Sequence, residues 1–143
     1  MDPAEMEAIL KEAQICRIAL TDGRQPYLVP LCFGYEPGSL YIHSAPKGTK
    51  IDLLRANPRV CFEVDFCNGV VKGDRPSSWG LRYRSVIGFG RAEFISDPAE
   101  KQHGLNCIMR QYDGGTHEFS DKEMKSVEVI RVAIESMTGK KKE

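Results

Sequence analysis

Residues 40–58, LYIHSAPKGTKIDLLRANP, join a strand, a glycine-containing loop and a short helix. The two-residue alternation in LYIH predicts the strand, and APKG predicts the loop that follows it. The run TKID at residues 49–52 predicts a helix start with a capping box, in which the side chains of Thr49 and Asp52 cap backbone N–H groups. The NP pair at the end of the stretch predicts where this helix stops.

The same stretch predicts an anion-binding site. The hydroxyls of Ser44 and Thr49, the ammonium of Lys50 and the free N–H groups of a helix N-terminus could converge on a phosphate. The pattern matches neither a Walker A loop nor a GxGxxG fingerprint. The alternative is that Lys47 and Lys50 are solvated surface charges and that Ser44 is a turn residue.

Length and composition limit the classes of protein that the chain can belong to. Its 143 residues predict a single domain over 1–143, and its 20 basic and 20 acidic residues give no net charge, which argues against a nucleic-acid or membrane partner. No signal peptide or membrane span is evident. The five cysteines form no CxxC pair, so we expect them to be reduced and mostly buried in a cytoplasmic protein. The three histidines lack the spacings of a zinc site.

The rest of the chain reads as short alternating strands with flanking helices. About six strands with mostly hairpin-length connections predict a mainly β fold, a six-stranded antiparallel barrel with helices beside it. Pro30 places the second strand at an edge or a bulge. Residues 67–80 are predicted to be the longest loop, and the C-terminal SMTGKKKE is predicted to be disordered. The predicted strands are residues 16–21, 27–35, 40–43, 60–65, 81–95 and 127–135. The predicted helices are residues 2–13, 49–57 and 97–112, and residues 120–126 are predicted to be a polar turn or a short helix.

Gly88 and Gly90 lie on one face of the longest predicted strand, together with Val86 and Ala92. Missing side chains on one face predict a bend, a bulge, or the close approach of another backbone or a ligand. A coiled barrel strand without any ligand explains the pattern equally well.

Four segments together resemble the FMN-binding split β-barrel proteins. They are YLVPLCFGYE, LYIHSAPKGTKIDLLRANPRVCFEV, YRSVIGFGRAEFI and VIRVAIESMTGK, and they cover nearly the whole chain in the order of that family. The chain is most similar to the pyridoxamine 5'-phosphate oxidase-like group that includes the 5-nitroimidazole resistance (Nim) proteins. The resemblance implies a six-stranded split barrel and a homodimer with FMN at the subunit interface.

The resemblance also implies which positions contact the cofactor. The positions that bind the phosphate are His43, Ser44, Thr49 and Lys50. The flavin is also contacted by Arg84 and Ser85 on the long strand, and its isoalloxazine ring lies along Val29, Pro30 and Leu31. The positions near the C-terminus are Gly139 and Lys140. His43 is the candidate catalytic residue, as a histidine on the substrate side that donates a proton or a hydrogen bond. It could equally bind the phosphate or only pack against its strand.

The activity that the resemblance implies is FMN-dependent reduction of a small organic acceptor, such as a nitroaromatic compound, with electrons from NADH or NADPH. In that reading Trp79 is either a lid over the flavin or an anchor for its loop. The alternatives are an FMN-binding or carrier protein without turnover, and a barrel that uses F420 or haem. The C-terminal tail has no histidine to ligate haem. Vitamin B6 oxidation is not expected, because the arginines with which the oxidase proper holds pyridoxal phosphate are not evident.

Overall fold

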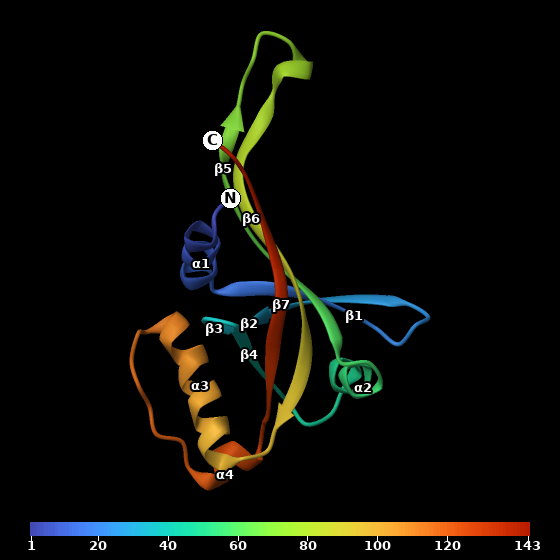
Figure 1. Cartoon of the computed structure of the whole chain (residues 1–143), viewed down its shortest axis with the longest axis vertical. Helices are drawn as coiled ribbons and strands as arrows, with labels where there is room; N and C mark the ends of the chain where they lie inside the picture. The colour runs from blue at the N-terminus through green and yellow to red at the C-terminus, as the bar shows by residue number, and fades with distance from the viewer.

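A computed structural model describes all residues, 1–143. It contains seven strands, four α-helices and one short 3-10 helix (Figure 1). In chain order these are α1 (Pro3–Glu12), β1 (Ile15–Thr21), β2 (Pro26–Cys32), β3 (Gly34–Glu36), β4 (Ser39–Ser44), α2 (Thr49–Ala56), β5 (Arg59–Val71), η1 (Pro76–Ser78), β6 (Gly80–Ile95), α3 (Pro98–Tyr112), α4 (Asp121–Lys125) and β7 (Glu128–Lys142). The prediction of a mainly β fold with flanking helices is confirmed.

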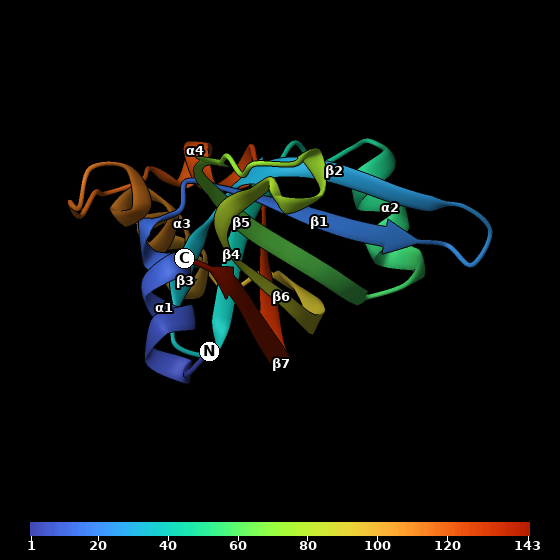
Figure 2. The ribbon, with the colours of Figure 1, turned by 90° about the horizontal axis from the view of Figure 1, so that it is seen from above.

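The strands form one antiparallel sheet in the order β2-β1-β5-β6-β7-β4-β3. β2 and β3 are the two edges of this sheet, yet only Phe33 separates them in the chain. The sheet must therefore coil until its edges approach each other, although no strand pairing closes it (Figure 2). The predicted number of six strands is wrong, because the predicted second strand divides at Phe33. The edge position predicted from Pro30 is confirmed.

The inner face of the coiled sheet holds the main hydrophobic core. Side chains of the barrel strands, such as Phe62, Leu40 and Val86, are fully buried there. Two helices complete the same core: α1 contributes Met6, Ile9 and Leu10, and α2 contributes Ile51 and Leu54. Burial of these apolar faces is the principal stabilising contribution to the fold.

Helix α3 lies outside the barrel and forms a second core on the outer face of the sheet. Its Leu105, Cys107 and Ile108 pack with Tyr41 of β4 and Val129 of β7. The helix and strand β3 approach so closely that a Cβ atom at Gly34 would lie 2.3 Å from the backbone carbon of Cys107. No helix of the structure is long and apolar enough to cross a membrane.

Gly88 and Gly90 allow close approach from within the protein. A Cβ atom at Gly88 would lie 2.1 Å from the ring of Phe62, and one at Gly90 would lie 2.4 Å from the carbonyl oxygen of Ala133. The pairing of β6 with β7 shifts register between Phe89 and Gly90, which is the predicted bulge. Since this face points into the core, packing explains both glycines without a ligand.

Three further local predictions are corrected. Helix α2 has Gly48 as its N-cap without any side-chain cap, so the predicted capping box of Thr49 and Asp52 does not form. The predicted long loop is mostly strand, because β5 extends to Val71 and pairs with the start of β6, which leaves residues 72–79 as the turn. Two of the five free cysteines, Cys32 and Cys67, are exposed rather than buried.

The C-terminal segment is also ordered rather than disordered, because β7 continues to Lys142 and pairs with β6. Residues 137–142 pair with β6 on one side only, so we expect the alternate backbone amides that face β6 to be protected from hydrogen exchange in the native protein. The measurement is native-state exchange followed by NMR or mass spectrometry. Exchange of these amides at the rate of an unstructured peptide would contradict the pairing, and the amides of turn residues 72–74, which donate no hydrogen bond, serve as the fast-exchanging reference.

Candidate functional site

Four of the predicted cofactor residues lie at the end of β4 and the start of α2, with His43 on the outer face of the sheet, beside α3, and Ser44 on the inner face. His43 and Ser44 are the last two residues of β4, where they pair with Val129 and Glu128 of β7. The Ser44 side chain is buried, and its hydroxyl donates to the carbonyl of Ala45 at 2.9 Å. Thr49 and Lys50 form the first turn of α2, one short loop away.

The N-terminus of α2 has free donors. The first intrahelical hydrogen bond runs from the Asp52 N–H to the Gly48 carbonyl at 3.0 Å, so the N–H groups of Thr49, Lys50 and Ile51 have no partner within the protein. No side chain caps them. Free N–H groups together with the positive end of the helix dipole favour an anion at this position.

The charges at this helix start are uncompensated. Lys50 forms no ion pair, while its partial burial lowers the pKa of its ammonium. The pKa of His43 is lowered by burial and, second, by the positive charge of Lys50. His43 is therefore neutral at pH 7, and Lys50 is a partly desolvated cation without a counter-ion. A bound anion would offset both effects.

A second group of predicted residues lies on the long strands β6 and β7. Ser85 pairs with Lys140, and its hydroxyl donates to the Lys140 carbonyl at 3.5 Å. Arg84 is already engaged, because its guanidinium forms a 2.7 Å ion pair with Glu12 and stacks 4.5 Å from the ring centroid of Phe66. Of this group, the Lys140 ammonium has no partner, and the Ser85 hydroxyl is held only by its long hydrogen bond to the Lys140 carbonyl.

One chain does not bring these two groups together. Val129, which pairs with His43, and Lys140, which pairs with Ser85, are eleven residues apart on β7. That separation is roughly 36 Å of extended strand. Gly139, between them in the fold, packs against the N-terminus, since a Cβ atom there would lie 2.4 Å from Met1 Sδ.

The three predicted residues of β2 divide between the two faces of the sheet. Pro30 is exposed on the outer face, opposite the exposed Arg17 of β1. Val29 and Leu31 point to the inner face, where Leu31 packs against the core. Because β2 is an edge strand, its outer backbone groups have no strand partner and can serve as donors or acceptors.

His43 lies at one end of an apolar groove of about 320 Å³ on the outside of the barrel. The groove runs between α3 and the segment that leads into β7, and Glu123 stands on its rim. The apolar lining residues are Leu105, Ile108, Met109, Tyr112, Phe119 and Val127. Of the α3 residues in this lining, Leu105 and Ile108 are buried, whereas Met109 and Tyr112 are not.

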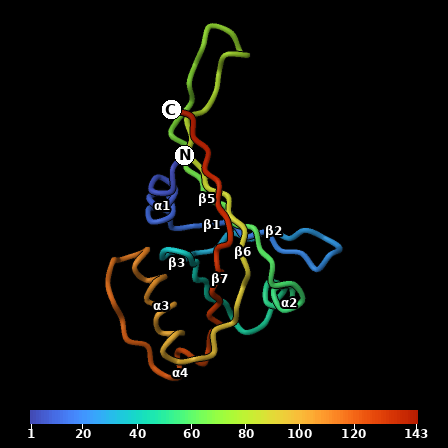
Figure 3. Tube along the Cα trace, viewed as in Figure 1, coloured from blue at the N-terminus to red at the C-terminus, as the bar shows by residue number.

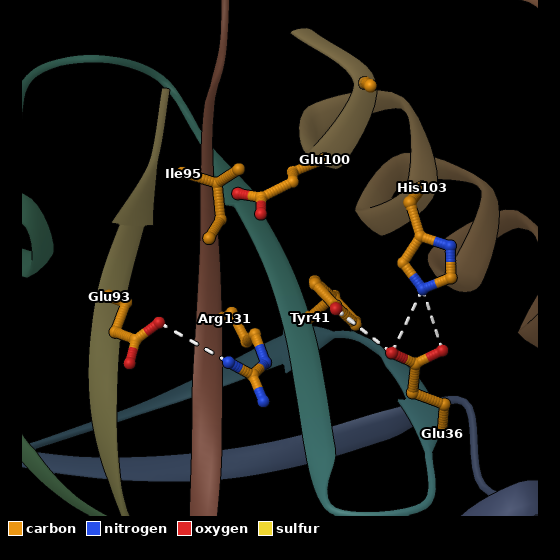
Figure 4. A pocket seen from close by; sticks show the side chains of 8 residues that line it. Glu36, Tyr41, Glu93, Ile95, Glu100, His103 and Arg131 are labelled. Carbon is orange, nitrogen blue, oxygen red and sulfur yellow. Dashed lines mark hydrogen bonds and ion pairs between the residues drawn. The ribbon is translucent and has the colours of Figure 1, made fainter. Parts of the chain in front are cut away.

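A second hollow of about 400 Å³, which sequence reasoning missed, lies on the other flank of α3 (Figure 4). Glu36 of β3 lines it, accepts a hydrogen bond from the Tyr41 hydroxyl at 3.0 Å and interacts with His103 Nε2 at 2.8 Å. Burial and then this carboxylate raise the pKa of Tyr41 to about 12. Across the hollow, Arg131 reaches Glu93 at 3.5 Å. These residues come from β3, β4, β6, β7 and α3, and no sequence motif links them.

The chain matches the protein-family model described as "Pyridoxamine 5'-phosphate oxidase" over residues 2–141. Among solved structures, it is similar to a candidate 5-nitroimidazole antibiotic resistance protein from Bacteroides thetaiotaomicron, with 37% identity, a TM-score of 0.87 and coverage of 96% of this chain and 82% of that one. A protein from Mycobacterium smegmatis described as binding FAD and haem has a TM-score of 0.90 at 22% identity, covering 99% and 72% of the two chains.

Two further matches support narrower conclusions. The flavocytochrome Anf3 of Azotobacter vinelandii has a TM-score of 0.87 at 24% identity, covering 99% of this chain and 68% of that one, so it shows the fold alone. An uncharacterized protein of Rhizobium meliloti is 33% identical over 64 residues, which are 45% of this chain and 42% of that protein. The chain thus aligns with less than half the length of this curated relative. Because the family match extends from residue 2 to residue 141, the chain belongs to the pyridoxamine 5'-phosphate oxidase family.

Proposed function

We propose that two copies of this chain, each a single domain over residues 1–143, hold FMN between them. In this proposal the protein transfers electrons from NADH or NADPH to a small organic acceptor, such as a nitroaromatic compound. The observation that carries the proposal is the unpaired, partly buried Lys50 beside the open N-terminus of α2. A phosphate monoester carries nearly two negative charges and three acceptor oxygens, which such a cluster of donors suits.

The residues around Lys50 fit the phosphate of FMN. Thr49 and the first-turn N–H groups are free donors, and neutral His43 can donate a hydrogen bond from its ring. Ser44 can turn its hydroxyl from the Ala45 carbonyl toward an anion. Arg84 fits less well, because binding a phosphate would require it to leave Glu12.

The distance between the two groups of predicted residues supports a second copy. Ser85 and Lys140 lie roughly 36 Å along β7 from His43, beyond the reach of one FMN molecule. If two copies associate with their long strands antiparallel, Ser85 and Lys140 of one copy approach Ser44 and Lys50 of the other. Pro30 and the free edge of β2 then offer an apolar surface and backbone groups to the ring.

The flavin supplies the redox chemistry when bound, and the protein supplies binding and orientation. In this proposal His43, which is neutral at pH 7, lies beside the reaction site and donates a hydrogen bond from its ring N–H to the acceptor. The 37% identity with the candidate 5-nitroimidazole resistance protein supports a nitro compound as the acceptor.

The test is the visible absorption spectrum of the purified protein, with the released cofactor identified by mass. We expect a flavin spectrum and about one FMN for each chain, and bleaching of the flavin by NADH or NADPH without oxygen. Bound FMN that neither donor reduces would leave a flavin-binding protein without this activity. A haem or F420 spectrum, or a protein that takes up no FMN, would overturn the cofactor assignment.

A further inference from the structure

The β5–β6 hairpin extends far beyond the core as an arm, here defined as residues 67–83 (Figures 1 and 3). It exposes three large apolar side chains: Val70 is 58% exposed, Trp79 is 49% exposed and Leu81 is 47% exposed. No helix or strand of the same chain other than β7 lies along the arm (Figure 1). Apolar side chains gathered on a projecting element are typical of a surface that contacts another molecule.

The turn of the arm holds Trp79 in a fixed position. The indole Nε1–H donates to the carbonyl of Gly73 at 2.9 Å, and the Ser78 hydroxyl donates to the carbonyl of Arg75 at 2.7 Å. The Lys72 ammonium lies 5.7 Å from the centroid of the indole ring. Trp79 thus anchors its own loop, as one of the two readings of the sequence predicted, while about half of its surface stays exposed.

The arm carries positive charge that nothing in the chain neutralises. Lys72, Arg75 and Arg82 form no ion pair, and Asp74 is the single acidic residue among residues 70–83. In a chain with no net charge, such a segment selects partners with an acidic surface.

The groove beside His43 is apolar and could accept the apolar side chains of the arm. Its apolar lining has space of about 320 Å³, with Tyr112 and Phe119 among its walls. Glu123 is the one carboxylate that lines the groove, and it forms no ion pair, although Lys122 and Lys125 lie on the same short helix α4. An apolar groove with one unpaired carboxylate can accept an arm with apolar side chains and unpaired cations.

The arm cannot reach this groove in its own chain, because the two lie at opposite ends of the molecule (Figures 1 and 3). A second copy of the chain can supply a groove that the arm reaches. In the arrangement proposed above, Ser85 of one copy lies near Ser44 and Lys50 of the other. Trp79 is six residues from Ser85 along β6, a reach of about 20 Å. His43, at the end of the groove, is the neighbour of Ser44.

We propose that the arm of each copy docks on the other copy, with Trp79 in the groove beside His43 and a basic arm residue near Glu123. This inference rests on the two-copy arrangement of the proposed function. Docking would cover His43 from solvent, so that each site is completed by a side chain of the other copy.

Trp79 is the only tryptophan of the chain, so its fluorescence reports the position of the arm directly. We expect the emission of the flavin-free protein to shift to the blue as concentration rises through the dimerisation range, and acrylamide quenching to fall. Met109→Glu, which places a charge in the groove, should return the emission to the red. Ala99→Glu, a matched change on the same helix outside the groove, should leave it unchanged.

A mixing experiment tests that docking occurs between chains. Trp79→Phe has an intact groove and no tryptophan, whereas Met109→Glu has an intact arm and an impaired groove. Adding the first variant to the second should restore the blue emission, because the Trp79 of one chain then meets the groove of the other. An unchanged emission, with subunit exchange verified by native mass spectrometry, would overturn the inference.

The outcome is separable from that of flavin binding, which absorbance reports. A dimer that binds FMN while its Trp79 stays accessible to acrylamide would overturn the docking and leave the proposed function standing. A dimer that shows the emission shift but takes up no FMN would overturn the proposed function and leave the docking standing. A protein that stays monomeric at all concentrations would overturn the docking and the shared site together.

Discussion

Lys50→Ala is expected to weaken FMN binding by about 1–3 kcal/mol, or about 5-fold to 150-fold in Kd, through loss of a charge-assisted hydrogen bond to the phosphate. The structure gives Lys50 no competing carboxylate and buries part of its stem, so its ammonium is available and poorly screened. The measurement is the quenching of FMN fluorescence on titration with flavin-free protein. An affinity equal to that of the unchanged protein would place the phosphate elsewhere.

Lys47→Ala is the matched control, because Lys47 lies in the loop just before α2 but is exposed and lacks the partial burial of Lys50. We expect it to change Kd by less than about threefold, as for an exposed surface charge. Equal losses in the two variants would mean that general positive charge, rather than a built phosphate site, attracts FMN.

The same variant has a second readout that needs no cofactor. Burial is the larger cause of the lowered His43 pKa, and the charge of Lys50 is the second cause. Removing that charge in Lys50→Ala should raise the pKa of His43, while Lys47→Ala should leave it as it is. Histidine proton chemical shifts measured against pH report this value. A His43 pKa that is unchanged in Lys50→Ala would show that the two side chains lie further apart than the structure has them.

Phe62→Ala is expected to lower the free energy of unfolding by about 3–5 kcal/mol, because Phe62 is fully buried at the centre of the barrel. Gly88→Ala should cost about 1–3 kcal/mol, since its new methyl group would lie 2.1 Å from the Phe62 ring. Urea denaturation measures both. Arg59→Ala, an exposed position on β5 without an ion pair, is the control and should stay within about 0.5 kcal/mol.

The contact between these two residues makes a sharper test. In Phe62→Leu the smaller side chain leaves room at Gly88, so Gly88→Ala should cost less in that background than in the unchanged protein. Additive effects would mean that the strain at Gly88 comes from the backbone of β6 and not from the Phe62 ring.

The features found from the sequence are those that local periodicity encodes. The alternation in β4, the helix start at Thr49 and the edge position from Pro30 each depend on a few neighbouring residues. The length of β7 escaped prediction because GKKK has no strand character of its own and becomes a strand by pairing with β6. The capping box failed at Thr49 because the chain enters α2 through Gly48 at φ +132°, which makes Gly48 the cap.

The candidate site was predictable only in part, because local sequence patterns do not encode contacts between distant segments. His43, Ser44, Thr49 and Lys50 are near one another in the chain, so their convergence follows from one turn. The position of Ser85 beside Lys140 depends on the register of two distant strands, and only a family resemblance could suggest it. The hydrogen bonds around Glu36 unite three separate elements, and nothing in the sequence signals them.

The last strand of the chain lies inside the sheet, between β6 and β4. Tyr41 of β4 pairs with Arg131 of β7, which follows it by 90 residues in the chain. The edge of β4 that faces β7 therefore stays unpaired until β7 has been synthesised. While the ribosome still holds β7, the emerging protein exposes unpaired edges on β4 and β6 that can join other nascent chains. We expect folding to complete only after β7 has left the ribosome, and chaperones that bind extended segments to have the most influence on yield during that interval.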